Sequence, residues 1–405
     1  MATNKEQNKL NVPHLRFPEF HGEWEKHGLS EYLDFKNGLN PDSKRFGKGI
    51  KFISVMDILN NPVITYDCIR ASVQATDAEI SSFSVENGDI LFQRSSETLE
   101  DVGRANVYID DKVAVFGGFV IRGKKKANYN PLFFRYLLSS PYARKRIIPM
   151  GAGAQHFNIG QEGLSKVSLN LPSIEEQTKI ASLLHLLDER IATQSKLIEE
   201  LKKLKSAIID YAINSLDTDF AKFGSLYEMA GEGGTPTTSN ASFYDNGKIP
   251  FIKIDDLKKK YLTENKDFIT ELGLQKSSAW LVPSRSILFS NGATIGEITI
   301  TTYPVCTKQG ILGIVPKPNI DVEFLYYFMS SSYFKKAVSR IVTEGTMKTA
   351  YLKDINNIRC PIPIKEKQQD IAKMPSALNS KIDFEQSILK RFCSQKQYLL
   401  RQMFM

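Results

Sequence analysis

A stripe of mostly apolar positions recurs in steps of four and three residues between residues 174 and 216. This is the pattern of a helix that packs one seam against a second helix. The segment contains neither Pro nor Gly, Ser173 stands at the expected N-cap, and Glu175 and Glu176 occupy the first turn, where acidic side chains stabilise the helix dipole. At about 1.5 Å per residue the predicted helix is roughly 65 Å long, so it requires a partner helix.

The same stripe returns near the C-terminus at an offset of 191 residues, and its polar interruptions return with it. Gln194 corresponds to Glu385, and Lys205 corresponds to Lys396. We expect Pro375, which replaces an apolar residue of the first copy, to kink the second helix or to delay its start. The two helices are predicted to pair as an antiparallel coiled coil. The predicted seam and partner-contact residues are Leu184, Leu187, Ile191, Ile198, Leu201, Ile208, Leu378, Ile382, Leu389, Phe392 and Leu399.

Short apolar runs between turn residues precede each long helix, and the second set of runs repeats the first. Residues 131–147 align with 322–338 at the same offset of 191, and the offset drifts earlier in the chain, which places insertions in loops. Strands are predicted at 51–55, 89–92, 113–116 and 119–121, and one helix over 131–147. The identical positions of the aligned helix are Phe133, Tyr136, Ser139, Ser140, Tyr142 and Lys145.

The predicted fold class is therefore α+β. Two similar globular halves, each a mixed sheet with helices, are joined by the two long helices in an internal pseudo-twofold repeat. The expected segments are a first half at 1–173, a central long helix at 174–216, a second half at 217–363 and a C-terminal long helix at 364–405.

Composition narrows the class of protein only slightly. The 53 Lys and Arg against 45 Asp and Glu leave a formal net charge of +8, which fits a polyanionic partner without requiring one. The four cysteines are scattered, which argues against a zinc site or a disulfide framework and favours a reducing cytosol. No apolar run approaches the ~20 residues of a membrane span, so we expect a soluble, cytoplasmic protein without membrane contact.

Motifs of catalysis are missing or incomplete. The glycine-rich segment 231–238 lacks the Lys of a phosphate-binding loop, so a turn is the better interpretation. Residues 130–133 approach the tetrapeptide of amino-methyltransferases but lack its second Pro, and they open a predicted helix instead. No carboxylate pair or histidine cluster stands out, so we expect no catalytic residue and no metal site in this chain.

Two pairs of matched loop segments could contact nucleic acid. Segments 93–96 and 290–294 each follow a Leu-Phe strand, and segments 151–158 and 343–349 each follow the amphipathic helix. They combine glycine with side chains that contact phosphates or base edges, but structural turns would explain them equally well. The candidate DNA-binding residues, with those of neighbouring basic loops, are Arg94, Ser95, Arg104, Lys124, Lys125, Gln155, His156, Asn158, Lys258, Lys259, Asn291, Lys308, Thr346 and Lys348.

Three features together resemble the specificity subunit of a bacterial type I restriction-modification system. They are the segment Leu-Arg-Phe-Pro-Glu-Phe at 15–20 with Trp24, the Pro-x-x-Glu-x-Gln-x-x-Ile-Ala sequence at 172–181 with a weaker copy at 363–372, and the order half–helix–half–helix. Gln368 preserves the pattern of Gln177 in the second copy.

The resemblance implies two target-recognition domains, each reading one half of a bipartite, asymmetric site in double-stranded DNA. The long helices would set the spacing of the half-sites and dock two modification (methyltransferase) subunits, with two restriction subunits completing the complex. S-adenosylmethionine, ATP and Mg²⁺ would be used by those partners, and this chain would bind none of them and be non-catalytic.

Two other interpretations compete with this one. A DNA methyltransferase in its own right would need the two motifs that are missing, and it would turn over S-adenosylmethionine alone. A coiled-coil scaffold without a DNA role would spread its basic surplus evenly and show no sequence-selective binding.

Overall fold

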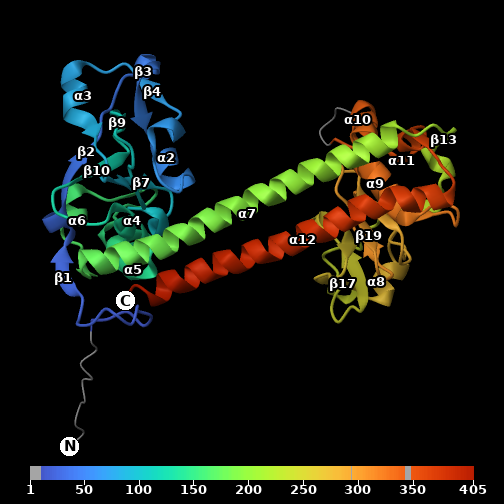
Figure 1. Cartoon of the computed structure of the whole chain (residues 1–405). Helices are drawn as coiled ribbons and strands as arrows, with labels where there is room; N and C mark the ends of the chain where they lie inside the picture. The colour runs from blue at the N-terminus through green and yellow to red at the C-terminus, as the bar shows by residue number, and fades with distance from the viewer. Residues whose placement is uncertain (1–10, 293, 343–347) are drawn as a thin grey trace, which may run out of the picture. The chain divides into compact units, whose positions relative to one another are not determined.

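The computed structural model describes residues 11–292, 294–342 and 348–405. The chain divides into two compact units: unit 1 holds residues 1–194 and 388–405, and unit 2 holds 195–387. Each unit contains one globular half and a stretch of each long helix (Figure 1). None of the described helices is long and apolar enough to cross a membrane.

The elements of the first globular half lead into the first long helix, α7. They are β1 (Glu25–Gly28), α1 (Leu29–Tyr32), β2 (Leu33–Asn37), β3 (Phe46–Ile53), α2 (Val55–Asn60), β4 (Ser72–Val73), α3 (Asp77–Phe83), β5 (Ser84–Val85), β6 (Ile90–Gln93), β7 (Ser95–Ser96), β8 (Ala105–Val107), β9 (Ala114–Phe116), β10 (Val120–Lys125), α4 (Pro131–Ser139), α5 (Pro141–Ile147), β11 (Phe157–Asn158), α6 (Gln161–Ser165), β12 (Ser168–Leu171) and α7 (Ile174–Asn214).

The second globular half leads into the second long helix, α12. Its elements are β13 (Phe220–Lys222), β14 (Tyr227–Glu232), β15 (Ile249–Ile252), β16 (Tyr261–Leu262), β17 (Asp267–Ile269), α8 (Glu271–Gln275), β18 (Ile287–Ser290), β19 (Ile298–Thr301), β20 (Cys306–Thr307), β21 (Ile311–Pro316), α9 (Val322–Ser330), α10 (Ser332–Ile341), α11 (Leu352–Ile355), β22 (Arg359–Pro361) and α12 (Lys365–Gln402). Short 3-10 turns link several of the elements in both halves.

The two units have the same sheet topology. One four-stranded sheet of unit 1 has the order β2-β10-β6-β8, and the five-stranded sheet of unit 2 has the order β14-β21-β18-β19-β16, which is the same arrangement with one added parallel edge strand. A second sheet contains a parallel pair in each unit, β3 with β9 and β15 with β20. The predicted α+β fold with mixed sheets and an internal repeat is confirmed.

The predicted helix over 131–147 is two helices, and the same break occurs in unit 2. Ser140 accepts a hydrogen bond from the N–H of Ala143 and caps α5, whose first residue is Pro141. A proline cannot continue the preceding helix because its ring excludes the helical backbone before it. Ser331, the counterpart of Ser140, caps α10 in the same way, so the single predicted helix was wrong and the shared break is part of the repeat.

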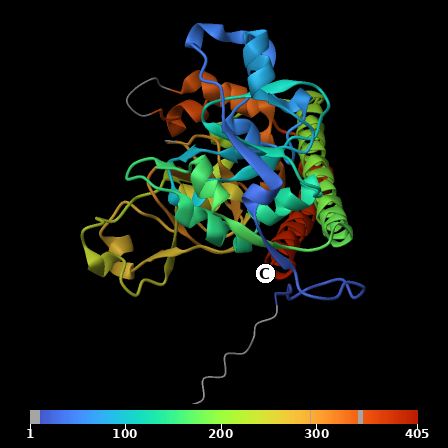
Figure 2. The same cartoon turned by 90° about the vertical axis from the view of Figure 1, so that its left-hand side faces the viewer.

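The long helices pair in antiparallel sense within each unit. In unit 1 the Lys396 ammonium lies 2.5 Å from the Asp188 carboxylate, and in unit 2 the Lys205 ammonium donates to Asn379 at 2.9 Å. Figure 2 shows α7 (green) and the end of α12 (red) beside the globular part of unit 1. Burial lowers the pKa of Lys205, and the nearby Asp383 carboxylate opposes this shift only in part.

The predicted seam is where the helices meet their neighbours. None of its eleven predicted apolar positions is exposed: Leu184, Leu187, Ile198, Ile382 and Leu399 are buried, and Ile191, Leu201, Ile208, Leu378, Leu389 and Phe392 are half-buried. In unit 1 the seam continues into the main core, where Leu184 and Leu399 join a cluster with Trp24 and Phe133. The helix therefore uses one stripe for both its partner helix and its own globular half.

Pro375 does not delay the second helix. Helix α12 begins at Lys365 and includes Pro375 as a buried residue. The expectation of a late start was wrong, because the neighbouring backbone of the helix is held in place on both sides of the proline by packing: Ala372 and Ile382 are both buried. The predicted kink stays a prediction.

The Gln of the Pro-x-x-Glu-x-Gln sequence is buried in both copies, and it makes the same two contacts in each. Gln177 donates to the carbonyl of Pro172 at 3.0 Å and accepts from the N–H of Asn130 at 3.0 Å. Gln368 donates to Pro363 at 2.8 Å and accepts from Asp321 at 2.8 Å.

These contacts tie the first turn of each long helix to the cap of a shorter one. Asn130 and Asp321 are the N-caps of α4 and α9. One amide side chain therefore satisfies backbone groups of two elements that would otherwise be buried without partners.

We predict that Gln368→Leu lowers the free energy of unfolding by about 2–4 kcal/mol, because it strands a buried N–H and a buried C=O. The neighbouring Gln369 is exposed, so Gln369→Leu is the matched control and should change stability by less than about 0.5 kcal/mol. Urea unfolding followed by fluorescence, to which Trp280 of the same unit contributes, measures both. Equal stability of the two variants would contradict the role given to Gln368.

Candidate nucleic-acid interface

Three segments that are distant in sequence meet at one point of unit 1, which we call junction 1. Arg94, directly after β6, donates its N–H to the carbonyl of Phe119 at 2.9 Å, and its own carbonyl accepts from the N–H of Ile159 at 2.9 Å. Strands β7 and β11 pair beside it. The loop after β6, the turn before β10 and the segment 151–159 therefore form one surface.

Unit 2 repeats this arrangement at junction 2. Asn291, directly after β18, donates its N–H to Gly310 at 3.0 Å, and its carbonyl accepts from Ala350 at 2.9 Å. Each of these residues is the counterpart of one at junction 1. In unit 1 the two predicted segments, 93–96 and 151–158, are thus joined in space through β7 and β11. In unit 2 the described contact is between Asn291 and Ala350, the residue that follows segment 343–349, and residues 343–347 lie outside the described residues.

Junction 1 carries polar side chains at its surface. The Ser95 hydroxyl hydrogen-bonds to Asn158 across β7 and β11, and Gln155 and His156 are exposed on the turn before Asn158. The Arg94 guanidinium is half-buried and donates to the carbonyl of Gly118 at 3.3 Å. Most of its donors remain available, so the junction offers a cation beside amide and imidazole groups, which can contact a phosphate or a base edge.

Junction 2 differs in its side chains. Lys308 and Lys348 are exposed, and neither ammonium has a partner among the described residues. Asn291 is buried and donates to the carbonyl of Ala350 at 3.3 Å, so its amide holds the loop together. Thr346 lies outside the described residues.

The remaining candidate residues of unit 1 have contacts of their own. Lys124 and Lys125 occupy the far end of β10, where Lys124 pairs with Glu86 at 2.7 Å and Lys125 donates to the carbonyl of Tyr129 at 3.1 Å. Arg104 pairs with Asp101 at 2.5 Å.

The side chain of Arg104 lines a groove of about 460 Å³ that also contains Arg135, Arg144 and Lys396. Burial and the charge of Arg104 lower the pKa of Arg144 to about 10. Three of these four cations already have a carboxylate partner, because Arg104 pairs with Asp101 and both Arg135 and Lys396 pair with Asp188. Most of the positive charge of the groove is therefore balanced, and the groove is a weak site for an anion.

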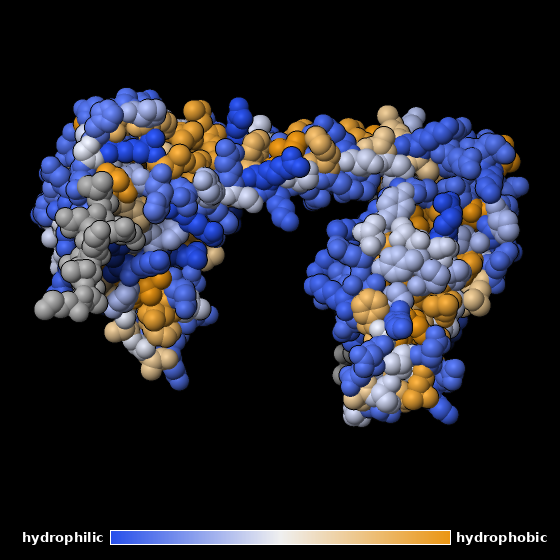
Figure 3. Space-filling model, turned by 90° about the horizontal axis from the view of Figure 1, so that it is seen from below, coloured by the Kyte–Doolittle hydropathy of each residue, from blue (hydrophilic) through white to orange (hydrophobic). Residues whose placement is uncertain are grey.

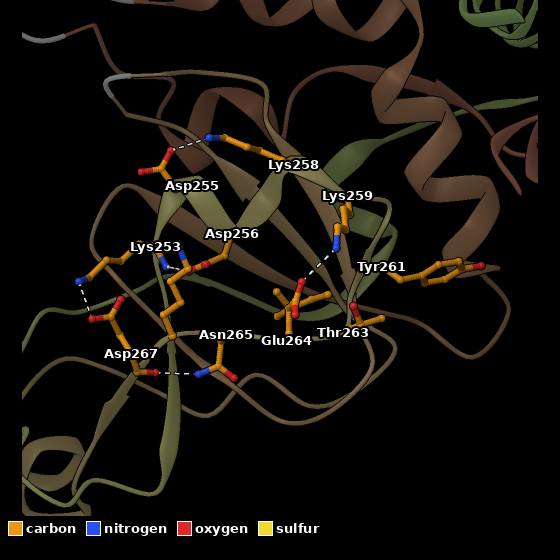
Figure 4. A pocket seen from close by; sticks show the side chains of 12 residues that line it. Lys253, Asp255, Asp256, Lys258, Lys259, Tyr261, Thr263, Glu264, Asn265 and Asp267 are labelled. Atoms are coloured by element: carbon orange, nitrogen blue, oxygen red, sulfur yellow. Dashed lines mark hydrogen bonds and ion pairs between the residues drawn. The ribbon is translucent and has the colours of Figure 1, made fainter. Parts of the chain in front are cut away.

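The lysine run of unit 2 is largely neutralised. Lys258 pairs with Asp255 at 3.0 Å and Lys259 with Glu264 at 3.0 Å, around a groove of about 660 Å³ (Figure 4). Hydrogen bonds and the charges of these lysines lower the pKa of both Asp255 and Glu264, which keeps the carboxylates ionised. The run therefore presents alternating charges, which is a weaker phosphate site than its sequence indicated.

Sequence inspection missed Phe119. It was expected inside a strand, but β10 begins at Val120 and leaves the Phe119 ring 69 % exposed in the turn at junction 1. An aromatic ring in that position can stack on a base or wedge between bases. The preceding Gly117 and Gly118 were the available signal, because a glycine pair marks a turn.

Comparison with known proteins identifies the chain. A family model described as the type I restriction modification DNA specificity domain matches residues 21–203 and again residues 217–391. The chain belongs to this family. The resemblance inferred from its sequence is confirmed, and the two matches coincide with the two halves of the repeat.

Relatives that are named as specificity subunits cover most of this chain and most of their own length. The MjaVIII specificity subunit of Methanocaldococcus jannaschii is 22% identical over 95% of this chain and 92% of its own length, and the HindI specificity subunit of Haemophilus influenzae is 22% identical over 73% and 80%. A crystal structure of the type I S subunit from M. genitalium matches 97% of this chain and 99% of its own length, with a TM-score of 0.57 and 17% identity. A chain from a structural study of type I complex assembly has a TM-score of 0.59, 14% identity and coverage of 94% and 97%. These two structures share the fold.

We predict that Arg94→Ala weakens binding of the target duplex about tenfold, or roughly 1.4 kcal/mol, because it removes the charged donor at the centre of junction 1. Lys112→Ala is the control: this exposed lysine of the same unit pairs with Asp67 at 3.4 Å, and its loss should alter affinity by no more than about twofold. Titrations at one fixed salt concentration compare the two variants, since affinity for DNA depends strongly on salt. Equal losses of DNA affinity in the two variants would show that junction 1 is not part of the interface.

Proposed function

We propose that this chain is the DNA sequence-recognition subunit of a type I restriction-modification complex and that it is not itself catalytic. The observation that carries the proposal is the repeated junction: two copies of one loop arrangement, centred on Arg94 and on Asn291, differ in the side chains they present. Membership of the specificity-domain family supports a role in DNA recognition.

Each globular half is proposed to read one half of a bipartite site. Segments 1–173 and 217–363 would be the two target-recognition domains. Junction 1 offers Arg94, His156 and Asn158, whereas junction 2 offers Lys308 and Lys348. Because different side chains recognise different base edges, the two half-sites should differ and the complete site should be asymmetric.

The long helices, with segments 174–216 and 364–405, are proposed to set the distance between the half-sites. Two observations support this role. The polar pairs Asp188–Lys396 and Lys205–Asn379 hold each helix in register with the other, and no seam position is exposed. A polar contact inside an apolar seam is a known device for fixing register.

Apolar side chains on the outer faces of the helices are proposed to contact partner subunits. Leu186 is 59 % exposed on α7, and Phe384 is 59 % exposed on α12. Figure 3 shows apolar residues (orange) interrupting a mainly hydrophilic surface. Such positions are typical of surfaces that another protein covers. Two modification subunits would cover these faces, and two restriction subunits would complete the complex.

Cofactor use is proposed to lie with those partners. S-adenosylmethionine would serve the modification subunits, and ATP with Mg²⁺ the restriction subunits, with the complex acting in the cytoplasm. A methyltransferase in this chain alone is the competing function. The segment 130–133 that approaches its tetrapeptide is the capped start of α4, since Asn130 accepts from the N–H of Phe133 at 3.0 Å.

Lengthening both helices tests the spacing role. One heptad inserted within 190–208 and another within 381–399 keeps the seam in phase and adds about 10 Å, or roughly 3 base pairs. We predict that methylome sequencing of cells expressing this variant with its modification subunits finds both half-sites unchanged and a wider gap between them. A variant lengthened in α7 alone is the control, and it should lose methylation because its seam is out of register. Methylation of the original gap by the doubly lengthened variant would refute the spacing role.

A further inference from the structure

In unit 1 residues 15–20 lie between the start of α7 and the end of α12. The N–H of Leu15 donates to the carbonyl of Gln402 at 2.8 Å, at the end of α12. The Arg16 guanidinium makes two hydrogen bonds with the buried Glu176 carboxylate of α7, at 2.8 and 2.7 Å. The segment therefore bonds to both helices at once.

The rest of this segment covers apolar surface. Phe17 packs against the core of unit 1, and the Lys179 ammonium lies 4.8 Å from the centre of its ring. Lys179 also forms an ion pair with Glu19. Beneath the segment, Ile180 is only 1 % exposed. Two ion pairs and an aromatic side chain thus seal this end of the helix pair.

The equivalent place in unit 2 is an open groove of about 800 Å³. Helix α7 passes through residues 215–219 directly into β13, so none of the described residues covers this groove as residues 15–20 cover the equivalent place in unit 1. The groove is lined by Tyr211, Ile364 and Met374, which are 77, 73 and 61 % exposed. Three large apolar side chains in one groove are unfavourable in water and are typical of a surface that another chain covers.

Two charged positions on the first turns of the long helices are reversed between the units, and the unit 2 groove also contains the exposed Asp217. At the offset of 191, Glu176 corresponds to Lys367, and Lys179 corresponds to Asp370. Lys367 lines the groove, is exposed and has no partner among the described residues. Asp370 also lines the groove and pairs with the exposed Lys373 of the same helix at 2.7 Å.

We propose that the unit 2 groove binds an extended segment of a partner polypeptide, built like residues 15–20 but with its two charges exchanged. Such a segment carries an acidic side chain for Lys367, an aromatic side chain for the space beside Tyr211 and Met374, and a basic side chain for Asp370. The proposal rests on the internal repeat and on the chemistry of the groove, and it is independent of DNA recognition.

Charge complementarity favours the exchanged segment over the chain's own segment from a second copy. In the unit 2 groove Arg16 would face Lys367, and Glu19 would face Asp370. Both contacts are repulsive, whereas exchange of the two charges makes both attractive. The charges of Lys367 and Asp370 therefore disfavour a segment with the sequence of residues 15–20 in the unit 2 groove.

Two labelled hexapeptides test the proposal on the full chain by fluorescence polarisation. One has the order of residues 15–20, Leu-Arg-Phe-Pro-Glu-Phe, and the other has the charges exchanged, Leu-Glu-Phe-Pro-Lys-Phe. We expect the exchanged peptide to bind about three- to tenfold more tightly, which is the effect of two exposed ion pairs. The double variant Lys367→Glu/Asp370→Lys should reverse this preference.

Two further variants locate the binding site. Ile364→Glu places a charge on the exposed apolar wall and should remove binding of both peptides, while Lys390→Glu, an exposed position of α12 in unit 1, should leave the preference unchanged. The proposal is overturned if neither peptide binds below about 1 mM, if both bind equally, or if the preference persists in the double variant.

Discussion

The pairing of α7 with α12 is the interaction on which both units depend. A helix of 41 residues with an apolar seam cannot remain single in water, and the partner helix of 38 residues comes from the same chain. In each unit the seam is buried against the partner helix and against one globular half. The register is held by a lysine that reaches across, to Asp188 in unit 1 and to Asn379 in unit 2.

The two lysine contacts occupy corresponding positions in units 1 and 2, but the partner side chains differ. Asp188 also accepts from the Tyr136 hydroxyl at 2.9 Å, and burial together with this carboxylate raises the pKa of Tyr136. In unit 2 Lys205 donates to the neutral Asn379, and the Asp383 carboxylate balances its charge only in part. The counterpart of Tyr136, Tyr327, instead hydrogen-bonds to Ser376 at 3.1 Å.

A second polar cluster beside Tyr327 has no counterpart in unit 1. Glu323, which stands where unit 1 has Leu132, pairs with the buried Lys260 and with the Tyr261 hydroxyl. Burial opposes ionisation of Glu323, but these hydrogen bonds outweigh it and hold the pKa of the carboxyl below its usual range. This charged replacement at an apolar position of the alignment is thus compensated by a lysine from a distant loop.

The sequence by itself determined the elements that depend on local periodicity. The heptad stripe placed both long helices, and the offset of 191 placed the repeat, because these patterns depend only on spacing along the chain. It also identified the paired loop segments that become junctions 1 and 2. It did not place the break at Ser140 correctly, although Pro141 was the local signal for it.

Only the tertiary structure decided what the polar side chains do. Lys260 and Lys258 are close in sequence, yet Lys260 is buried against Glu323 while Lys258 stands at the surface with Asp255. Phe119 lies exposed at junction 1 because the turn before β10 projects it there, and Asn291 is buried because Ala350 folds over it. The contacts of such side chains come from residues tens of positions away, so no local pattern encodes them. The same holds for the unit 2 groove, which exists only because α7 and α12 converge where nothing equivalent to residues 15–20 is present.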